Sequence, residues 1–482
     1  MKRQDLHVTL VLSIVALLSG CAVGPDYEEP LFGLQGPSLI GEDTRFTEVA
    51  PDPFWWRQWD DPVLEKLIMQ GVLYNKDLQI AWANLNESRA LRGLQELDLL
   101  PSVTADGTYQ NSKASENVFR NGFPTFDSSQ DDFYSLGFDA TWELDLYGRV
   151  RRQAEAARAR FEKSTSSYEN TLISLVSEIA REYAELRGFD DRLEIAKRNA
   201  GNQKKTLEVT QNLEESGLGN EFDRTRAEAN LALTESSIPE LKGEQLAALN
   251  RLAVLIGLMP GEITEWMKPR AGIISVPTEV AVGLSSEILR RRPDIKVAER
   301  ELAAATAEVG VAEADFFPRF VFSGSLSLDS SDAGKIFTAG SGTWSFGPGM
   351  QWAFLDLGRV IQNKRAADAR LDAAVAMYEK AVLTALEETL SAMARLEAES
   401  KRAAKLAEAV KANRRAVELS KIRYQQGLDS LLPVLDVERQ LLQSEEELSL
   451  SQTRQSILLI TLYKALGGLA LPPPSVLTQL TS

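Results

Sequence analysis

The stretch that decides the fold is residues 134–144, which read YSLGFDATWEL. Its even-numbered positions are apolar, and its odd-numbered positions carry Ser, Gly, Asp, Thr and Glu. Strict alternation is the period of a β-strand, because successive side chains point to opposite faces. Residues 343–354 (TWSFGPGMQWAF) and 319–329 (RFVFSGSLSLD) alternate in the same way, and residues 102–110 do so more weakly. The sequence therefore predicts four two-faced strands.

These strands have the pattern of a transmembrane β-barrel, in which apolar and polar faces alternate over about ten residues. Tyr134 and Trp142 are eight residues apart, as are Trp344 and Trp352. Eight residues rise about 26 Å along a strand, and a tilt of roughly 40° brings this close to the height of the apolar band. We therefore expect these four side chains to form two aromatic girdles. The alternative is a β-sandwich with one buried face, which the near absence of long charged side chains on the polar face disfavours.

Four strands leave open edges, and open edges are not tolerated in lipid. Other copies of the chain must therefore complete the barrel. Two copies would give eight strands, a barrel filled by its own side chains, whereas three give twelve strands, the first closed option with an appreciable lumen. By elimination, the strands predict a homotrimer.

The chain after its first segment is a duplication. Asp77-Leu78-Gln79-Ile80-Ala81 reappears 217 residues later, and from Trp142 onward the spacing to the second copy is 210 residues. Only the segment between Pro101 and Trp142 changed length, which places a loop there. We expect these parts: a lipoprotein signal peptide (1–20), an N-terminal extension with an equatorial segment (21–75), the first repeat (76–270), the second repeat (271–470) and a tail (471–482).

Each repeat reads helix, strand, loop, strand, very long helix, tight turn, helix. Residues 76–99 have a helical pattern, and residues 149–215 contain no proline while apolar residues recur at spacings of three and four. A helix of that length is roughly 100 Å long. Residues 359–425 repeat the pattern. The fold class is mixed α and β, and the long helices belong to a bundle or tube. A plain coiled-coil scaffold fits the helices equally well, and only the strands argue against it.

The connections carry two further expectations. Residues 113–131 and 330–342 join paired strands and are rich in Ser, Asp, Asn and Gly, so we expect exposed loops. The turns at Gly217-Leu218-Gly219 and Gly427-Leu428 each join two long helices, and glycine permits the sharp reversal.

The N-terminus looks like a processing segment. Lys2 and Arg3 precede an apolar run at 10–18 that is too short to span a bilayer. The run ends in Leu18-Ser19-Gly20-Cys21, which resembles a bacterial lipobox. The resemblance implies cleavage before Cys21 and acyl chains, including palmitate, on that cysteine. An ordinary signal peptide with a chance cysteine is the alternative. Ala22, rather than an aspartate, favours the outer membrane.

The composition excludes several classes of function. The formal net charge is -16, so nucleic acid is not an expected partner. The only histidine is His7, inside the signal segment, and Cys21 is the only cysteine. This excludes Ser-His-Asp and Cys-His catalysis and metals held by His or Cys. We expect no enzyme, no metal and no cofactor other than the covalent lipid. A tethered carboxylate-dependent hydrolase and a structural spacer lipoprotein remain as alternatives.

Several segments resemble one family from end to end of the mature chain. They are CAVGPDY (21–27), WELDLYGR (142–149), LRRRPDI (289–295) and YQQGL (424–428). They are similar to outer-membrane factors of the TolC/OprM type, the NodT-like efflux lipoproteins. The resemblance implies a trimer with a twelve-stranded outer-membrane barrel and a long helical periplasmic tunnel. It also implies a passive exit duct of a multidrug-resistance pump. Its partners would be a periplasmic adaptor (membrane fusion protein), an inner-membrane transporter of the RND class and outer-membrane lipid.

The same resemblance implies site residues. The turns at Gly217, Leu218 and Gly219 and at Gly427 and Leu428 would be the periplasmic tips that dock the adaptor. The TolC gate positions would fall on Asp223, Tyr424 and Asp436, near those turns. Two positions depart from TolC: Pro433 stands where a second aspartate ring would be, and Asp429 replaces an arginine. The closing contacts must therefore differ here, and Arg226, three residues after Asp223, is a candidate partner for it.

Overall fold

The computed structural model describes residues 22–30, 45–113, 119–120, 123–124, 130–267, 272–283 and 290–468. The chain divides into two compact units. Unit 1 comprises residues 1–30, 85–164 and 297–378, and unit 2 comprises residues 31–84, 165–296 and 379–482. Each unit contains parts of both sequence repeats, because elements from the two repeats pack and pair with one another.

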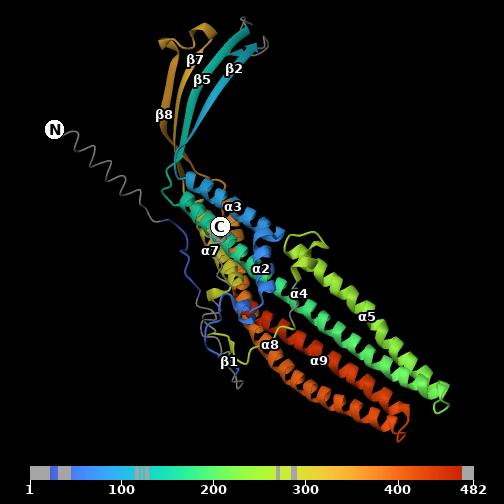
Figure 1. Cartoon of the computed structure of the whole chain (residues 1–482). Coiled ribbons are helices and arrows are strands. Elements are labelled where there is room, and N and C mark those ends of the chain that lie inside the picture. Colours follow the sequence, from blue (N-terminus) through green and yellow to red (C-terminus); the bar gives the residue numbers. More distant parts are fainter. Residues whose placement is uncertain are drawn as a thin grey trace. The chain divides into compact units, whose positions relative to one another are not determined.

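Unit 1 contains a four-stranded antiparallel sheet in the order β2-β5-β7-β8 (Figure 1). Its strands are β2 (Ser102–Lys113), β5 (Gln130–Glu143), β7 (Arg319–Ser330) and β8 (Gly342–Gln351). All four predicted strands are confirmed. The predicted end of the last one at residue 354 is wrong, because β8 stops at Gln351, opposite the first residue of β7. Trp352 and Phe354 therefore follow the strand in this chain.

The strand loops are only partly described. Between β7 and β8 the chain forms two short 3-10 turns, η3 (Ala333–Lys335) and η4 (Ala339–Ser341). Between β2 and β5, β3 (Phe119–Arg120) pairs with β4 (Phe123–Pro124). Gly122 and most of residues 113–131 lie outside the described residues.

Two medium helices precede the strand pairs. They are α3 (Lys76–Leu97) and α7 (Pro293–Ala314). The first ends two residues before the predicted residue 99, because the residue before a proline avoids helical backbone and Pro101 follows closely. The two long helices are also confirmed. They are α4 (Arg149–Glu215) and α8 (Leu357–Gln425), which begin in unit 1 and end in unit 2.

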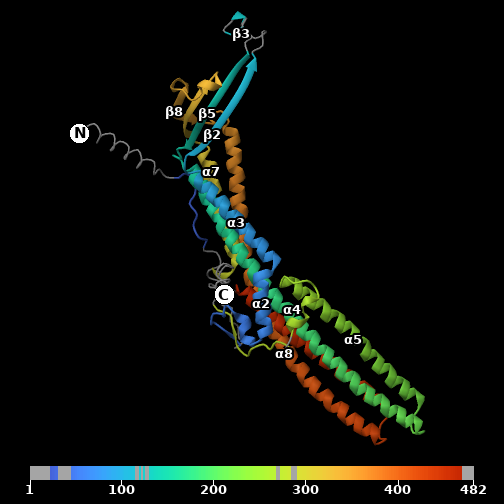
Figure 2. The same ribbon diagram turned by 45° about the horizontal axis from the view of Figure 1, so that its top comes forward.

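Unit 2 contains two antiparallel helical hairpins. In one, the end of α4 turns into α5 (Glu221–Leu255), and in the other α8 turns into α9 (Leu431–Ala465). The two hairpins lie side by side in both views (Figures 1 and 2). Among the described residues, none of the helices is both long enough and apolar enough to cross a membrane.

The remaining elements of unit 2 are short. They are β1 (Phe46–Thr47), η1 (Trp55–Trp59), α2 (Pro62–Tyr74), η2 (Glu262–Met267) and β6 (Val280–Ala281). β1 and β6 pair in parallel. The side chain of Asp61 caps α2 by accepting the backbone N–H groups of Val63 and Leu64. The Trp55 ring stacks on Tyr463 of α9 at 5.3 Å between centroids, so this N-terminal segment is packed against the long helices.

The contact between α4 and α9 depends on one glycine. A Cβ added at Gly188 would lie 2.7 Å from Cγ2 of Thr453 and closer still to its Oγ1. We expect Gly188→Ala to lower the free energy of unfolding by about 1–2 kcal/mol despite the better helix propensity of alanine, because overpacking costs roughly 1–3 kcal/mol. Denaturant unfolding followed by circular dichroism measures the change. Thr453→Ala should restore stability in the double variant, and an unrestored double variant would contradict this contact.

Candidate functional site

The sheet of unit 1 has one apolar face and one polar face. Register places apolar pairs such as Phe138 with Leu326 on one side, and Asp139 with Ser325 on the other. None of the described residues covers the apolar face: Trp344, Phe346 and Met350 are 65–69% exposed. An apolar sheet face of this size requires either lipid or a protein partner.

Polar side chains bond to one another across the other face of the sheet. Ser135 donates to Asp329 at 2.7 Å, and the hydroxyls of Ser325 and Ser345 lie 2.8 Å apart. Short hydroxyl and carboxylate side chains leave room above such a face. The surface can therefore line a water-filled space.

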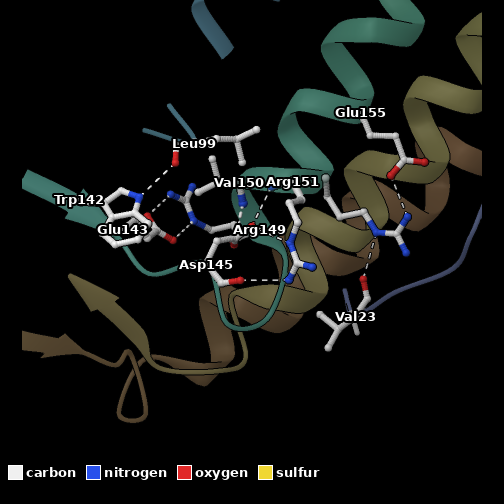
Figure 3. Close-up of polar contacts among 10 residues, drawn as sticks. Val23, Leu99, Trp142, Glu143, Asp145, Arg149, Val150, Arg151 and Glu155 are labelled. Carbon is white, nitrogen blue, oxygen red and sulfur yellow. Dashed lines mark hydrogen bonds and ion pairs between the residues drawn. The ribbon is translucent and has the colours of Figure 1, made fainter. Parts of the chain in front are cut away.

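The sheet is joined to the helices by tryptophan side chains. The Trp142 indole donates to the carbonyl oxygen of Leu99 at 3.0 Å (Figure 3), and Trp352 donates to that of Phe316 at 3.0 Å. The two bonds occupy equivalent places in the two repeats. Both residues were expected in an aromatic girdle, and the structure adds that each fixes the end of the hairpin to the end of the preceding helix.

The start of α4 is held by charged groups at the same junction. The Asp145 carboxylate accepts the backbone N–H groups of Val150 and Arg151, both at 2.9 Å, which satisfies free donors at the helix N-terminus (Figure 3). Arg149 pairs with Glu143 of β5 through two hydrogen bonds. Strand, turn and helix are therefore locked together here.

Residues 22–30, which we call the N-terminal strap, lie on unit 1. Arg152, whose side chain is 5% exposed, donates to the carbonyl oxygens of Val23 and Gly24 and pairs with Asp26 at 2.7 Å. A Cβ at Gly24 would collide with Cα of Gly310, so the strap lies directly on the backbone of α7. Cys21 itself lies outside the described residues.

The two helical turns have the same geometry. Gly217 and Gly427 both have φ of 70°. The N–H of Leu218 donates to Leu213 and that of Leu428 donates to Arg423, each at 2.9 Å. This is a helix C-terminal motif that needs a left-handed residue, which glycine adopts without strain.

Apolar side chains project from both turns. Leu218 is 81% exposed and Leu428 is 62% exposed. One turn further, the equivalent residues Phe222 and Leu432 are 65% and 51% exposed. Together they offer an apolar surface to a partner.

The turns differ at their third residue. A Cβ at Gly219 would lie about 3 Å from the backbone of Leu213 and Glu214. The equivalent Asp429 is bound by Arg423, with 2.5 Å between Nε and Oδ2. This hydrogen bond lowers the pKa of Asp429. Asp429, at the position where TolC has an arginine, is thus paired with Arg423 at its own turn.

Two of the three expected gate residues come together in the chain. Tyr424 of α8 packs against a buried cluster that includes Ala227 of α5 and Leu431 of α9. Burial raises the pKa of Tyr424, and the nearby Asp223 carboxylate raises it further. Asp223 of the first hairpin therefore lies near Tyr424 of the second.

The other expected gate residues bond locally. Asp436 accepts hydrogen bonds from Arg439 and Gln440 on its own helix. The Arg226 guanidinium lies over the Phe222 ring at 5.0 Å. Within the described part of the chain no ion pair joins Arg226 to Asp223, and Asn220 donates to that carboxylate instead. Pro433 lies in the first turn of α9, where proline is tolerated.

Sequence reasoning missed two carboxylates on α9. Glu445 is 4% exposed and accepts hydrogen bonds from Asn199 of α4 and Arg414 of α8. Seven residues away, Glu438 accepts from Thr206 of α4 and pairs with Lys421 of α8. Each group contains one residue from each of the three helices, and the two groups are seven residues apart on every helix. Charged residues spaced by seven within the apolar stripe of α9 were the sequence signal that could have revealed these two carboxylates. The described residues contain no cluster of three or more metal-ligating side chains.

Comparisons with known proteins agree with this architecture. The family model described as outer membrane efflux protein matches residues 67–258 and 284–468. A probable efflux pump outer membrane protein, TtgC of Pseudomonas putida, is 31% identical over 95% of each chain. Nodulation protein T of Rhizobium leguminosarum is 28% identical over 94% of this chain and 95% of its own length.

Solved structures have the same fold. The outer-membrane channel OprN is 37% identical, with a TM-score of 0.87 over 93% of this chain and 99% of its own. The MtrE outer membrane channel of Neisseria gonorrhoeae is 28% identical, with a TM-score of 0.82 over 93% of this chain and 98% of its own. The chain therefore belongs to the outer membrane efflux protein family, whose members are channels of the outer membrane and not enzymes.

Proposed function

We propose that this protein is the passive exit duct of a tripartite efflux system, assembled as a homotrimer. The observation that carries the proposal is the sheet, which combines an exposed apolar face, a polar face and two edge strands, β2 and β8. Such a sheet is stable in lipid only when its edges are paired. Three copies supply twelve strands and a lumen lined by the polar face.

The aromatic positions support tilted strands. Tyr134 lies opposite Ser330 of β7, whereas Trp344 lies opposite Leu326, four residues away along the same strand. Strands of a barrel are tilted, so a girdle parallel to the membrane crosses the sheet at a stagger of this kind. Tyr134 and Trp344 would form one girdle, and Trp142 and Trp352 the other.

Cys21 would add a lipid anchor to this barrel. Ala22 approaches Gly148 so closely that a Cβ on the glycine would collide with it. Ala22, which follows Cys21 in the sequence, therefore lies at the turn between β5 and α4. Acyl chains on Cys21 would then enter the inner leaflet of the outer membrane beside the barrel.

The partners follow from the helical turns and from the relatives. Several relatives are named as efflux pump outer membrane proteins. The apolar turn residues Leu218 and Leu428 would dock a periplasmic adaptor, which would connect the duct to an inner-membrane transporter of the RND class. The adaptor would open a resting gate formed by Asp223, Tyr424 and Asp436 near the turns, with Arg226 and Asp429 beside them.

Planar-bilayer recording tests both the duct and its gate. The wild-type protein should form cation-preferring channels that are mostly closed, because rings of carboxylates attract cations. The double variant Asp223→Ala, Asp436→Ala should lose most of this preference and open severalfold more often. A matched control is Glu408→Ala with Glu418→Ala, which removes two carboxylates paired to Lys405 and Arg415 on the surface of α8.

The outcomes separate the two parts of the proposal. A wild-type protein that never conducts would refute the duct and would favour a structural lipoprotein. A conducting wild type with an unchanged double variant would refute the gate alone.

A further inference from the structure

Four helices of unit 1 line a cavity of about 570 Å³. They are α3, α4, α7 and α8, and the volume falls within the range of roughly 300–1,000 Å³ that is typical of small-molecule sites. The residues proposed to form the gate and to dock an adaptor all belong to unit 2. The cavity therefore shares no residue with them, and the function proposed above gives it no role.

The cavity lies on the side of α7 that faces away from the N-terminal strap. The strap meets α7 at Gly310, where a Cβ on Gly24 would collide with the backbone. Glu308 and Ala312 line the cavity, and each is two residues from Gly310, which corresponds to a turn of about 200° around the helix. The strap directly follows Cys21 in the sequence, and acyl chains on Cys21 would require the strap to lie outside the duct. In the proposed duct the cavity therefore faces the lumen.

Small side chains give the cavity its room and an apolar wall. Alanines from three helices line it: Ala157 of α4, Ala312 of α7, and Ala366 and Ala367 of α8. Leu91 of α3, which is 54% exposed, adds apolar surface. Removing apolar surface from water is favourable by about 25 cal/mol for each Å². The cavity can therefore hold the apolar body of a small molecule.

One charged side chain at the cavity has no partner. The other charged side chains that line it form ion pairs, which are Arg160 with Glu308, Arg92 with Glu96, and Asp315 with Arg319. Arg370 of α8 is exposed, and none of the described residues forms a hydrogen bond or an ion pair with it. Both carboxylates at the cavity thus have a cation beside them, whereas one guanidinium has no anion. The cavity therefore offers a place for an anionic group next to its apolar wall.

We propose that this cavity binds amphipathic anions on their way through the duct. The planar guanidinium of Arg370 would hold the anionic group through charge-assisted hydrogen bonds, and the alanines would contact the apolar body. The inference rests on the proposed duct and names a class of molecule for one part of its wall. Binding must be weak, because a molecule in a channel has to leave as well as enter.

Block of the open-channel current in planar bilayers tests the site. The full-length protein is recorded with naphthalenesulfonate, an amphipathic anion, in both chambers. Arg370→Ala should raise the half-blocking concentration roughly tenfold, which corresponds to about 1.4 kcal/mol. The matched control is Arg365→Ala, which should leave the block unchanged. Arg365 lies on the same helix and also has no ion pair among the described residues, but it does not line the cavity.

A second pair of variants changes the space in the cavity and leaves its charge. Ala366 lines the cavity at an exposed position, so Ala366→Leu should fold normally and weaken the block severalfold. Ala369→Leu, at an exposed position of the same helix outside the cavity, should not weaken it. Methanesulfonate carries the same anionic group without an apolar body, and it should block much more weakly than naphthalenesulfonate.

The outcomes separate the site from the duct. Equal block of the wild type and Arg370→Ala would overturn the anion site, and equal block by the two sulfonates would overturn its apolar part. A wild-type channel that conducts but is not blocked would overturn the site and leave the duct intact. A protein that never conducts would refute the duct, and the site with it.

Discussion

Replacing both turn glycines, Gly217→Val with Gly427→Val, is expected to abolish efflux while leaving assembled protein in the outer membrane. Both residues have φ of 70°, and a Cβ at either would meet open space. The cost is therefore one of backbone conformation, about 1–2 kcal/mol for each left-handed residue and more for a β-branched one. The turn can relieve this strain only by changing shape. That would displace Leu218 and Leu428, the side chains proposed to contact the adaptor.

The measurement is accumulation of a fluorescent efflux substrate in cells that express the variant as the sole outer-membrane component. The matched control is Gly243→Val in the middle of α5, where a Cβ also meets open space but φ is not positive. Asparagine tolerates the left-handed conformation, so Gly217→Asn with Gly427→Asn should retain most of the efflux. Normal efflux in the valine double variant would contradict docking at these turns.

Arg187→Leu should produce the largest loss of stability of any single substitution considered for unit 2. The Arg187 side chain is 1% exposed, and it donates to Asp190 at 2.9 Å and to the Tyr183 hydroxyl at 3.0 Å. Tyr183 in turn donates to Asp61, the residue that caps α2, and Gln245 of α5 donates to Asp190. The guanidinium thus holds Tyr183 and Asp190, which link α4 to α2 and α5.

Leucine fills much of the volume but removes the guanidinium that pairs with the buried Asp190. Breaking a buried ion pair by removing one partner costs about 3–5 kcal/mol. Urea unfolding of the detergent-extracted protein, followed by helical circular dichroism, should therefore show a markedly lower midpoint. Arg415→Leu is the matched control, because Arg415 is 62% exposed and pairs with Glu418 one turn away, and such surface substitutions change stability little. Equal midpoints for the two variants would rule out a structural role for the buried network.

The sequence by itself determined the elements and their repetition. Alternation over residues 134–144 and 319–329 is enough to predict strands, because a strand between lipid and water must change face at every residue. The absence of proline from residues 149–215 and the glycines at the turns predicted α4 and α8 to within two residues, because helix interruption is a local property. The glycines also located the two turns, whereas their proposed role in docking came from the family resemblance.

Only the tertiary structure decided which groups meet. The pairing of β5 with β7, the contact of Gly188 with Thr453, and the N-terminal strap held by Arg152 join residues that are more than one hundred positions apart. No local pattern encodes such contacts, since they depend on how the helices pack. The pairing of strands also decides why β8 ends at Gln351. A strand extends only as far as a neighbour can hydrogen-bond to it, and within the described part of the chain β8 has β7 as its single neighbour.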